Sequence, residues 1–218
     1  NNIYLLESIV ELVAKPGELI LDPFAGVGSL IVAAPNNPLV LIEIEAPFAK
    51  LAQETAELNE RSDVIVLQGD CRQILPVPCD HAVFSPPFAA DLITGGQKFL
   101  TDKVKANISN YAGDSAQNTN LGKFNRFYFS QSMKGVYKLL ALSISRTLTI
   151  ILRDSISGGQ RQFLSMTAIR DITNEGFILI GWHKRSTGSS FFRATAKSKG
   201  KSTVDEEDVL VFQRSAFK

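Results

Sequence analysis

The residues that first indicate a ligand-binding site form a short run near the N-terminus, Asp22-Pro23-Phe24-Ala25-Gly26-Val27-Gly28-Ser29. Apolar residues 19–21 lead into it, and residues 29–34 continue with the composition of a helix. This order, an acidic residue at a strand end followed by a turn with two glycines and a helix, is typical of a binding site for a small ligand. We call residues 22–29 the cradle. The third glycine of a dinucleotide site and the Lys-Ser/Thr of a P-loop are both missing. Asp22 would also repel a pyrophosphate, and it favours a ligand with a positive centre.

Three later strand ends carry residues that would complete a ligand site. Glu43 follows the apolar run 39–42, Asp70 comes after 64–67, and Ser85 follows 82–84. Because the carboxyl ends of parallel strands share one edge, these side chains are expected to converge on the cradle. Glu43 suits a ribose diol, and Asp70 suits the exocyclic amine of a base. A cationic ligand with a ribose and a base, but without phosphates, is S-adenosylmethionine.

The elements that must position these residues alternate between strand and helix. Apolar spacing predicts a helix over 3–14, stopped by Lys15-Pro16-Gly17. Continuous apolar runs over 39–42 and 64–67 are typical of strands buried on both faces. Alternating strands and helices predict right-handed crossovers and a parallel sheet. In full, we expect helices over 3–14, 29–34 and 47–60, and strands over 19–21, 39–42, 64–67 and 82–84.

The second part of the chain begins with a segment, 89–135, that is broken by Gly, Asn and Ser and reads mostly as loop. The elements predicted after it are a helix over 129–145, a strand over 147–152, a turn at 157–159, a helix over 160–174, and strands over 177–183 and 209–213. The last two strands are expected to form an antiparallel hairpin at the sheet edge.

Composition and charge narrow the class of protein. The 218 residues suit one domain with a sizeable core. No run approaches the length of a membrane span, no basic signal region opens the chain, and the two cysteines are not paired in a CxxC motif. We therefore expect a cytoplasmic protein of a prokaryotic cell or of a virus acting in its host. Residues 1–90 carry about −8 and residues 91–218 about +9, which indicates a polyanionic partner.

Two motifs together resemble the amino-methyltransferases that modify exocyclic amines in DNA. Asp22–Gly28 is similar to their cofactor motif DPFxGxG, and Ser85-Pro86-Pro87-Phe88 to their catalytic motif, (Asn/Asp/Ser)-Pro-Pro-(Tyr/Phe). Ile42–Glu45 and Gly69-Asp70 match the ribose-binding and adenine-binding strand ends, and the helix over 3–14 sits where the family lines the methionine part. The resemblance assigns S-adenosylmethionine to Asp22, Pro23, Phe24, Ala25, Gly26, Gly28, Ser29, Glu43, Ile44, Asp70 and Cys71.

The resemblance also implies the fold. We expect an α/β, Rossmann-like methyltransferase fold with a mostly parallel seven-stranded sheet, an antiparallel C-terminal strand and helices on both faces. Residues 1–218 are predicted to form a single catalytic domain, in which 89–135 is a target-recognition insertion.

The tetrapeptide 85–88 has a physical rationale. An amino group on cytosine or adenine is a poor nucleophile because its lone pair is delocalised into the ring. The Ser85 hydroxyl and the Pro86 carbonyl can accept its two hydrogens and direct the lone pair at the methyl group. Pro86 and Pro87 fix this backbone, and Phe88 can stack on a base flipped from the duplex.

Ser at the first motif position is associated in this family with cytosine N4, which makes this the expected target, whereas Asn or Asp is associated more with adenine N6. A Pro-Cys nucleophile, as in cytosine C5 enzymes, is the competing reading of Pro78-Cys79. Cys79 precedes its strand and would lie at the opposite sheet edge, so we interpret it as a core or loop residue.

The basic half of the chain is expected to bind the nucleic acid. Both 89–135 and 183–201 follow strands that end at the ligand edge. The residues predicted to contact it are Lys98, Lys123, Arg126, Lys184, Arg185, Arg193 and Lys197.

The sequence therefore predicts a DNA (cytosine-N4) methyltransferase that uses S-adenosylmethionine and no metal. It would act on double-stranded DNA, away from membranes, as a monomer or a weak dimer. An adenine-N6 enzyme, an RNA amino-methyltransferase and a non-catalytic nucleic-acid-binding homologue remain alternatives.

Overall fold

The computed structural model describes residues 2–87, 120–157, 160–186, 198 and 203–215. The first part contains α1 (Ile3–Val13), β1 (Ile20–Asp22), α2 (Ser29–Ala33), β2 (Leu39–Glu43), α3 (Ala46–Leu58), β3 (Val64–Gln68), α4 (Cys71–Ile74) and β4 (Cys79–Phe84). The second part contains η2 (Leu121–Lys123), α7 (Arg126–Ser143), β5 (Ile144–Leu152), β6 (Ser155–Ser157), β7 (Gln160–Gln162), α8 (Leu164–Asn174), β8 (Phe177–Ser186) and β9 (Glu206–Arg214).

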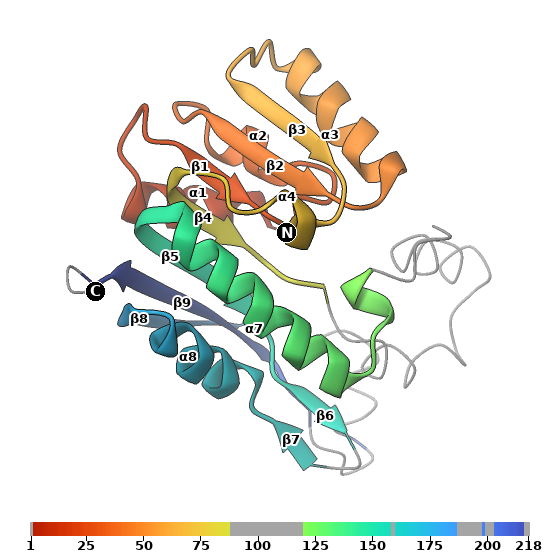
Figure 1. Ribbon diagram of the computed structural model, residues 1–218, viewed down its shortest axis with the longest axis vertical. Coiled ribbons are helices and arrows are strands. Elements are labelled where there is room, and N and C mark those ends of the chain that lie inside the picture. Colours follow the sequence, from red (N-terminus) through yellow and green to blue (C-terminus); the bar gives the residue numbers. More distant parts are fainter. Residues whose placement is uncertain (1, 88–119, 158–159, 187–197, 199–202, 216–218) are drawn as a thin grey trace.

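Seven strands form one sheet in the order β3-β2-β1-β4-β5-β9-β8 (Figure 1). Neighbouring strands from β3 to β5 are parallel, and β9 is antiparallel to both β5 and β8. The order reverses between β1 and β4, which is where ligands bind in such sheets. The structure confirms the predicted mostly parallel sheet with its antiparallel C-terminal strand.

Helices cover both faces of the sheet. Apolar side chains of α1, α2 and α3 form one buried cluster against it, and those of α4, α7 and α8 form a second. In Figure 1, α7 and α8 lie in front of the sheet. Between these two helical layers, the strands contribute fully buried side chains to the core, among them Leu21, Ile42, Phe84 and Ile150.

Two predictions about elements are wrong. The strand over 64–67 is not buried on both faces, because β3 is the edge of the sheet and Ile65 is 56% exposed. Residues 160–162 are not the start of a helix. They form β7, which pairs with β6 in a separate two-stranded sheet, and α8 begins at Leu164. The helix expected from 129 begins earlier, at Arg126, where the Asn125 side chain accepts a hydrogen bond from the Tyr128 amide.

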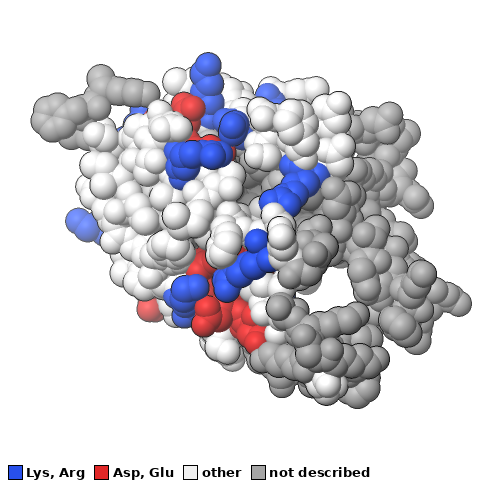
Figure 2. Space-filling view, turned by 90° about the horizontal axis from the view of Figure 1, so that it is seen from below, with Lys and Arg blue, Asp and Glu red and all other residues white. Residues whose placement is uncertain are grey.

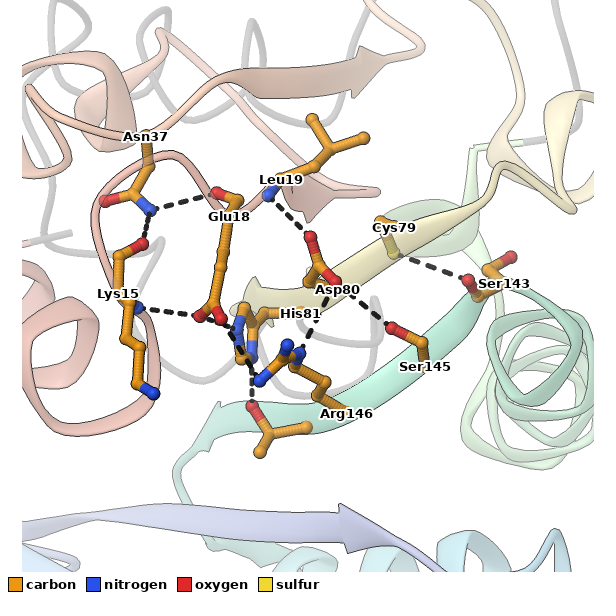
Figure 3. A network of polar contacts seen from close by, with 11 residues as sticks. Lys15, Glu18, Leu19, Asn37, Cys79, Asp80, His81, Ser143, Ser145 and Arg146 are labelled. Carbon is orange, nitrogen blue, oxygen red and sulfur yellow. Dashed lines mark hydrogen bonds and ion pairs between the residues drawn. The ribbon is translucent and has the colours of Figure 1, made fainter.

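A polar network closes the amino edge of the sheet (Figure 3). The buried His81 imidazole lies between the Glu18 carboxylate at 2.9 Å and the Thr147 hydroxyl at 2.7 Å. Arg146 pairs with Glu18 at 3.1 Å, and the Leu19 amide donates to Asp80 at 3.0 Å. The network joins the approach to β1 with the starts of β4 and β5, which lie next to one another in the sheet.

Candidate functional site

A cavity of about 390 Å³ lies at the carboxyl edge of the sheet. Its wall includes Asp22 at the end of β1, Glu43 at the end of β2, Asp70 after β3 and Ser85 after β4. The four side chains predicted to converge on one site therefore do so. Leu6 of α1 also lines the cavity. A volume of this size is within the range of small-molecule sites.

A side-chain hydrogen bond from within the turn after β1 stabilises that turn. Asp22 Oδ1 accepts a hydrogen bond from the Phe24 amide at 2.9 Å. Pro23, Phe24, Ala25, Gly26 and Ser29 line the cavity as expected.

Gly28 is the exception among the predicted cofactor residues, because it does not line the cavity. It has a left-handed φ of 78°. A Cβ added here would lie 2.8 Å from Ile31 Cδ1 and 3.1 Å from Ala52 Cβ. Its role in this structure is therefore to let α2 start in this conformation and pack closely on α3.

Two carboxylates in the cavity have altered proton affinity. Burial raises the pKa of Asp22 to about 7, although the Phe24 amide opposes this shift. Burial also raises the pKa of Glu43. Without a positive partner, both carboxylates are costly to ionise. A cationic ligand beside Asp22 would offset this cost.

Glu43 organises the floor of the cavity. One carboxylate oxygen accepts from the Gly26 amide at 2.7 Å and the other accepts from the Glu45 amide at 2.9 Å. A carboxylate oxygen can accept a second hydrogen bond, so capacity is left for the two hydroxyls of a ribose. Ile44 lines the cavity beside it.

Sequence reasoning missed a contact between Glu45 and Asn120. Both side chains are buried, and Asn120 Nδ2 donates to Glu45 Oε1 at 2.6 Å. Asn120 Oδ1 accepts from the Gly122 amide at 2.8 Å. Residues 120–122 thereby become part of the cavity wall. The partners are 75 positions apart, and no local motif marks Asn120.

Asp70 lines the cavity, but its carboxylate already forms hydrogen bonds with Arg72. Its side chain caps α4 through the Arg72 amide at 2.9 Å and pairs with the Arg72 guanidinium, with Nη2 at 2.6 Å from Oδ2. A base amine would share this carboxylate with Arg72. Cys71 lines the cavity too, and burial raises the pKa of its thiol to about 12, so it is not a thiolate at neutral pH.

The Ser-Pro-Pro segment separates two cavities. Ser85, Pro86 and Pro87 line the ligand cavity, and the two prolines also line a second cavity of about 120 Å³ between α7, α8 and the end of β5. Phe88 lies outside the described residues. A group in the second cavity would lie across this segment from a group in the first.

The structure describes only some of the residues that are predicted to contact nucleic acid. Arg126 lines the second cavity. Lys184 pairs with Glu206 at 3.1 Å, and Arg185 pairs with Glu207 at 3.1 Å. Basic and acidic side chains lie next to one another on the lower face (Figure 2). The residues that the structure leaves undescribed are Lys98, Arg193 and Lys197, together with the side chain of Lys123.

Several other features concern residues outside the cavity. Cys79 is buried at the amino end of β4, beside Ser143, as expected for a core residue. The described residues contain no group of His, Cys, Asp and Glu arranged to hold a metal ion. They also contain no helix long and apolar enough to cross a membrane.

Residues 2–54 match a family model described as DNA methylase. This stretch contains the whole Asp22–Gly28 turn and Glu43, so the resemblance to DNA amino-methyltransferases is confirmed over it. No curated protein sequence matches the chain closely enough to indicate a relative.

Several solved structures share the fold. A magnesium protoporphyrin IX methyltransferase from Synechocystis, crystallised with SAH, aligns with a TM-score of 0.61 and 15% identity, over 98% of this chain and 83% of that one. A proposed RNA methyltransferase from Pyrococcus horikoshii aligns with 0.58 and 13%, over 99% and 81%. TrmN from Thermus thermophilus aligns with 0.52 and 17%, over 97% and 48%. These structures confirm the predicted fold, and the family match over residues 2–54 agrees with the predicted cofactor.

Proposed function

We propose that this S-adenosylmethionine-dependent methyltransferase acts on DNA and methylates the exocyclic N4 amine of cytosine. One observation carries the proposal: Ser85, Pro86 and Pro87 line the same cavity as Asp22, Glu43 and Asp70. The cofactor residues and the candidate amine-binding segment are thus within one site. The DNA methylase match over residues 2–54 supports DNA as the substrate.

The residues present fit the cofactor and its acceptor. S-adenosylmethionine supplies an electrophilic methyl group on a sulfonium. In the proposed site Asp22 binds its positive end, and Glu43 binds the ribose. Ser85 and the Pro86 carbonyl hold the two amine hydrogens and direct the nitrogen lone pair. The bound cofactor would supply the methyl group, with its C–S bond exchanged for the new N–C bond and the electron pair left on sulfur, and the proton lost by the amine would pass to water. Positioning of this kind supplies much of a rate enhancement.

The test measures transfer of labelled methyl groups from S-adenosylmethionine to duplex DNA and, in parallel, to total RNA. We expect incorporation into DNA. Label found only in RNA would contradict the proposed substrate and favour the RNA alternative. Binding of the cofactor with no transfer to either polymer would favour a non-catalytic homologue.

Ser85→Ala should lower kcat at least tenfold while the Kd for S-adenosylmethionine changes less than threefold, because the hydroxyl is assigned to the amine and not to the cofactor. Ser62→Ala, on an exposed loop residue outside this cavity, is the matched control and should keep wild-type turnover. Unchanged kcat in Ser85→Ala would remove Ser85 from the proposed reaction.

A further inference from the structure

The outward face of α7 carries a stripe of aromatic and basic side chains. Phe127, Gln131, Lys134 and Lys138 follow one another at intervals of four, three and four residues, which places them on one side of a helix. All four are exposed, in contrast to the buried Met133, Val136, Tyr137 and Leu140 of the opposite side. Tyr128 lies beside Phe127, with ring centroids 5.6 Å apart in an edge-to-face arrangement.

The aromatic end of the stripe is unusually open. Phe127 is 67% exposed and Tyr128 is 60% exposed. Neighbouring residues of the same turn, Arg126, Phe129 and Ser130, line the second cavity behind Pro86 and Pro87. The stripe therefore begins on the same turn of α7 as three residues that line the second cavity, and it runs away from that turn along the helix.

Among the described residues, no ion pair compensates the positive charge of this face. α7 contains no Asp or Glu, and neither Lys134 nor Lys138 forms an ion pair with a described residue. Helices α4 and α8, which pack against α7, contribute one acid, Asp171, and it is buried and paired with Arg170. In contrast, Arg153, Lys184 and Arg185 at the nearby sheet edge all pair with acids of β9.

We propose that this stripe binds the nucleic-acid strand next to the target base. Phe127 and Tyr128 offer stacking surfaces for bases, and Lys134 and Lys138 contact phosphates. With a rise of 1.5 Å per residue, the lysines lie about 10 and 16 Å along the helix from Phe127. At about 3.4 Å per nucleotide of duplex, this distance corresponds to three to five nucleotides. The proposal rests on the proposed function, because it assumes a polynucleotide substrate.

The experiment measures binding of a fluorescein-labelled duplex oligonucleotide by anisotropy over a series of salt concentrations. The double variant Lys134→Ala/Lys138→Ala should bind about tenfold more weakly, and the slope of log K against log salt should fall by about 1.8. The matched control Lys15→Ala/Lys50→Ala removes the same charge from exposed positions outside α7, and it should leave the slope unchanged.

The aromatic end is tested separately. Phe127→Ala should weaken binding about tenfold without changing the salt slope, because stacking releases no counterions. Tyr4→Ala removes an aromatic side chain that is 79% exposed on α1 and should have no effect.

The outcomes separate this proposal from the proposed function. Equal salt slopes in the two lysine variants, while the wild-type protein methylates DNA, would overturn the stripe alone. A wild-type protein that binds S-adenosylmethionine but no oligonucleotide would overturn both. Unchanged cofactor affinity in every variant shows that the fold is intact.

Discussion

Asp22 links the charge of the ligand to the protonation of the site. Burial of its carboxyl, together with the nearby charge of Glu43, raises the pKa of Asp22 to about 7. Because the group accepts a proton as the pH falls through this value, the carboxylate needed for a cationic ligand is lost in the same range. Cofactor binding near neutral pH should therefore release a proton.

The Kd for S-adenosylmethionine should rise about tenfold between pH 8 and pH 6, as the ionised fraction of Asp22 falls. Calorimetric titration at several pH values measures this. In Asp22→Asn the affinity should be low throughout, and the part of the pH dependence due to Asp22 should vanish. Identical pH profiles in the two proteins would show that Asp22 does not carry the effect.

Asn120 extends the cofactor site beyond the predicted residues. Asn120→Ala removes the 2.6 Å hydrogen bond to Glu45 and releases residues 120–122 from the cavity wall. A buried hydrogen bond to a charged group is worth about 1.5–3 kcal/mol, so we expect the Kd for the cofactor to rise at least tenfold. Asn59→Ala, on an exposed amide at the end of α3, is the control. Equal affinities would show that the contact does not shape the site.

At the scale of elements, local sequence carried much of the prediction. Each strand end and the turn after β1 could be placed because apolar runs, glycines and acids are contiguous in the chain. The exposure of β3 could not be, since an apolar run does not reveal which strand lies at the edge. The pairing of Lys184 with Glu206 depends on the register between β8 and β9, and the Asn120–Glu45 contact joins distant segments. Neither is encoded in a local pattern.

Gly28→Ala tests how the turn after β1 depends on packing between α2 and α3. A left-handed φ and a contact of 2.8 Å with Ile31 should together lower the free energy of unfolding by about 2 kcal/mol. Urea unfolding followed by circular dichroism measures it. Gly135→Ala is a contrasting control, because Gly135 lies within α7 with nothing within 4 Å of the added Cβ. It should stabilise by about 0.5–1 kcal/mol. If both variants lose stability equally, the packing argument for Gly28 is wrong.

At the scale of the whole molecule, the two edges of the sheet differ: a polar network lies at the amino ends of the strands, and the cavities lie at their carboxyl ends. At the amino edge, His81 and its partners join three segments in one polar network (Figure 3). At the carboxyl edge, two cavities share Pro86 and Pro87.

The central claim is that Ser85 and the Pro86 carbonyl direct an exocyclic amine at the methyl group. The most direct test is mass spectrometry of nucleosides from duplex DNA treated with the protein and methyl-deuterated S-adenosylmethionine. We predict the label in N4-methylcytosine. Label in N6-methyladenine would contradict the choice of base. Label on cytosine C5, or in no DNA nucleoside, would contradict the central claim itself.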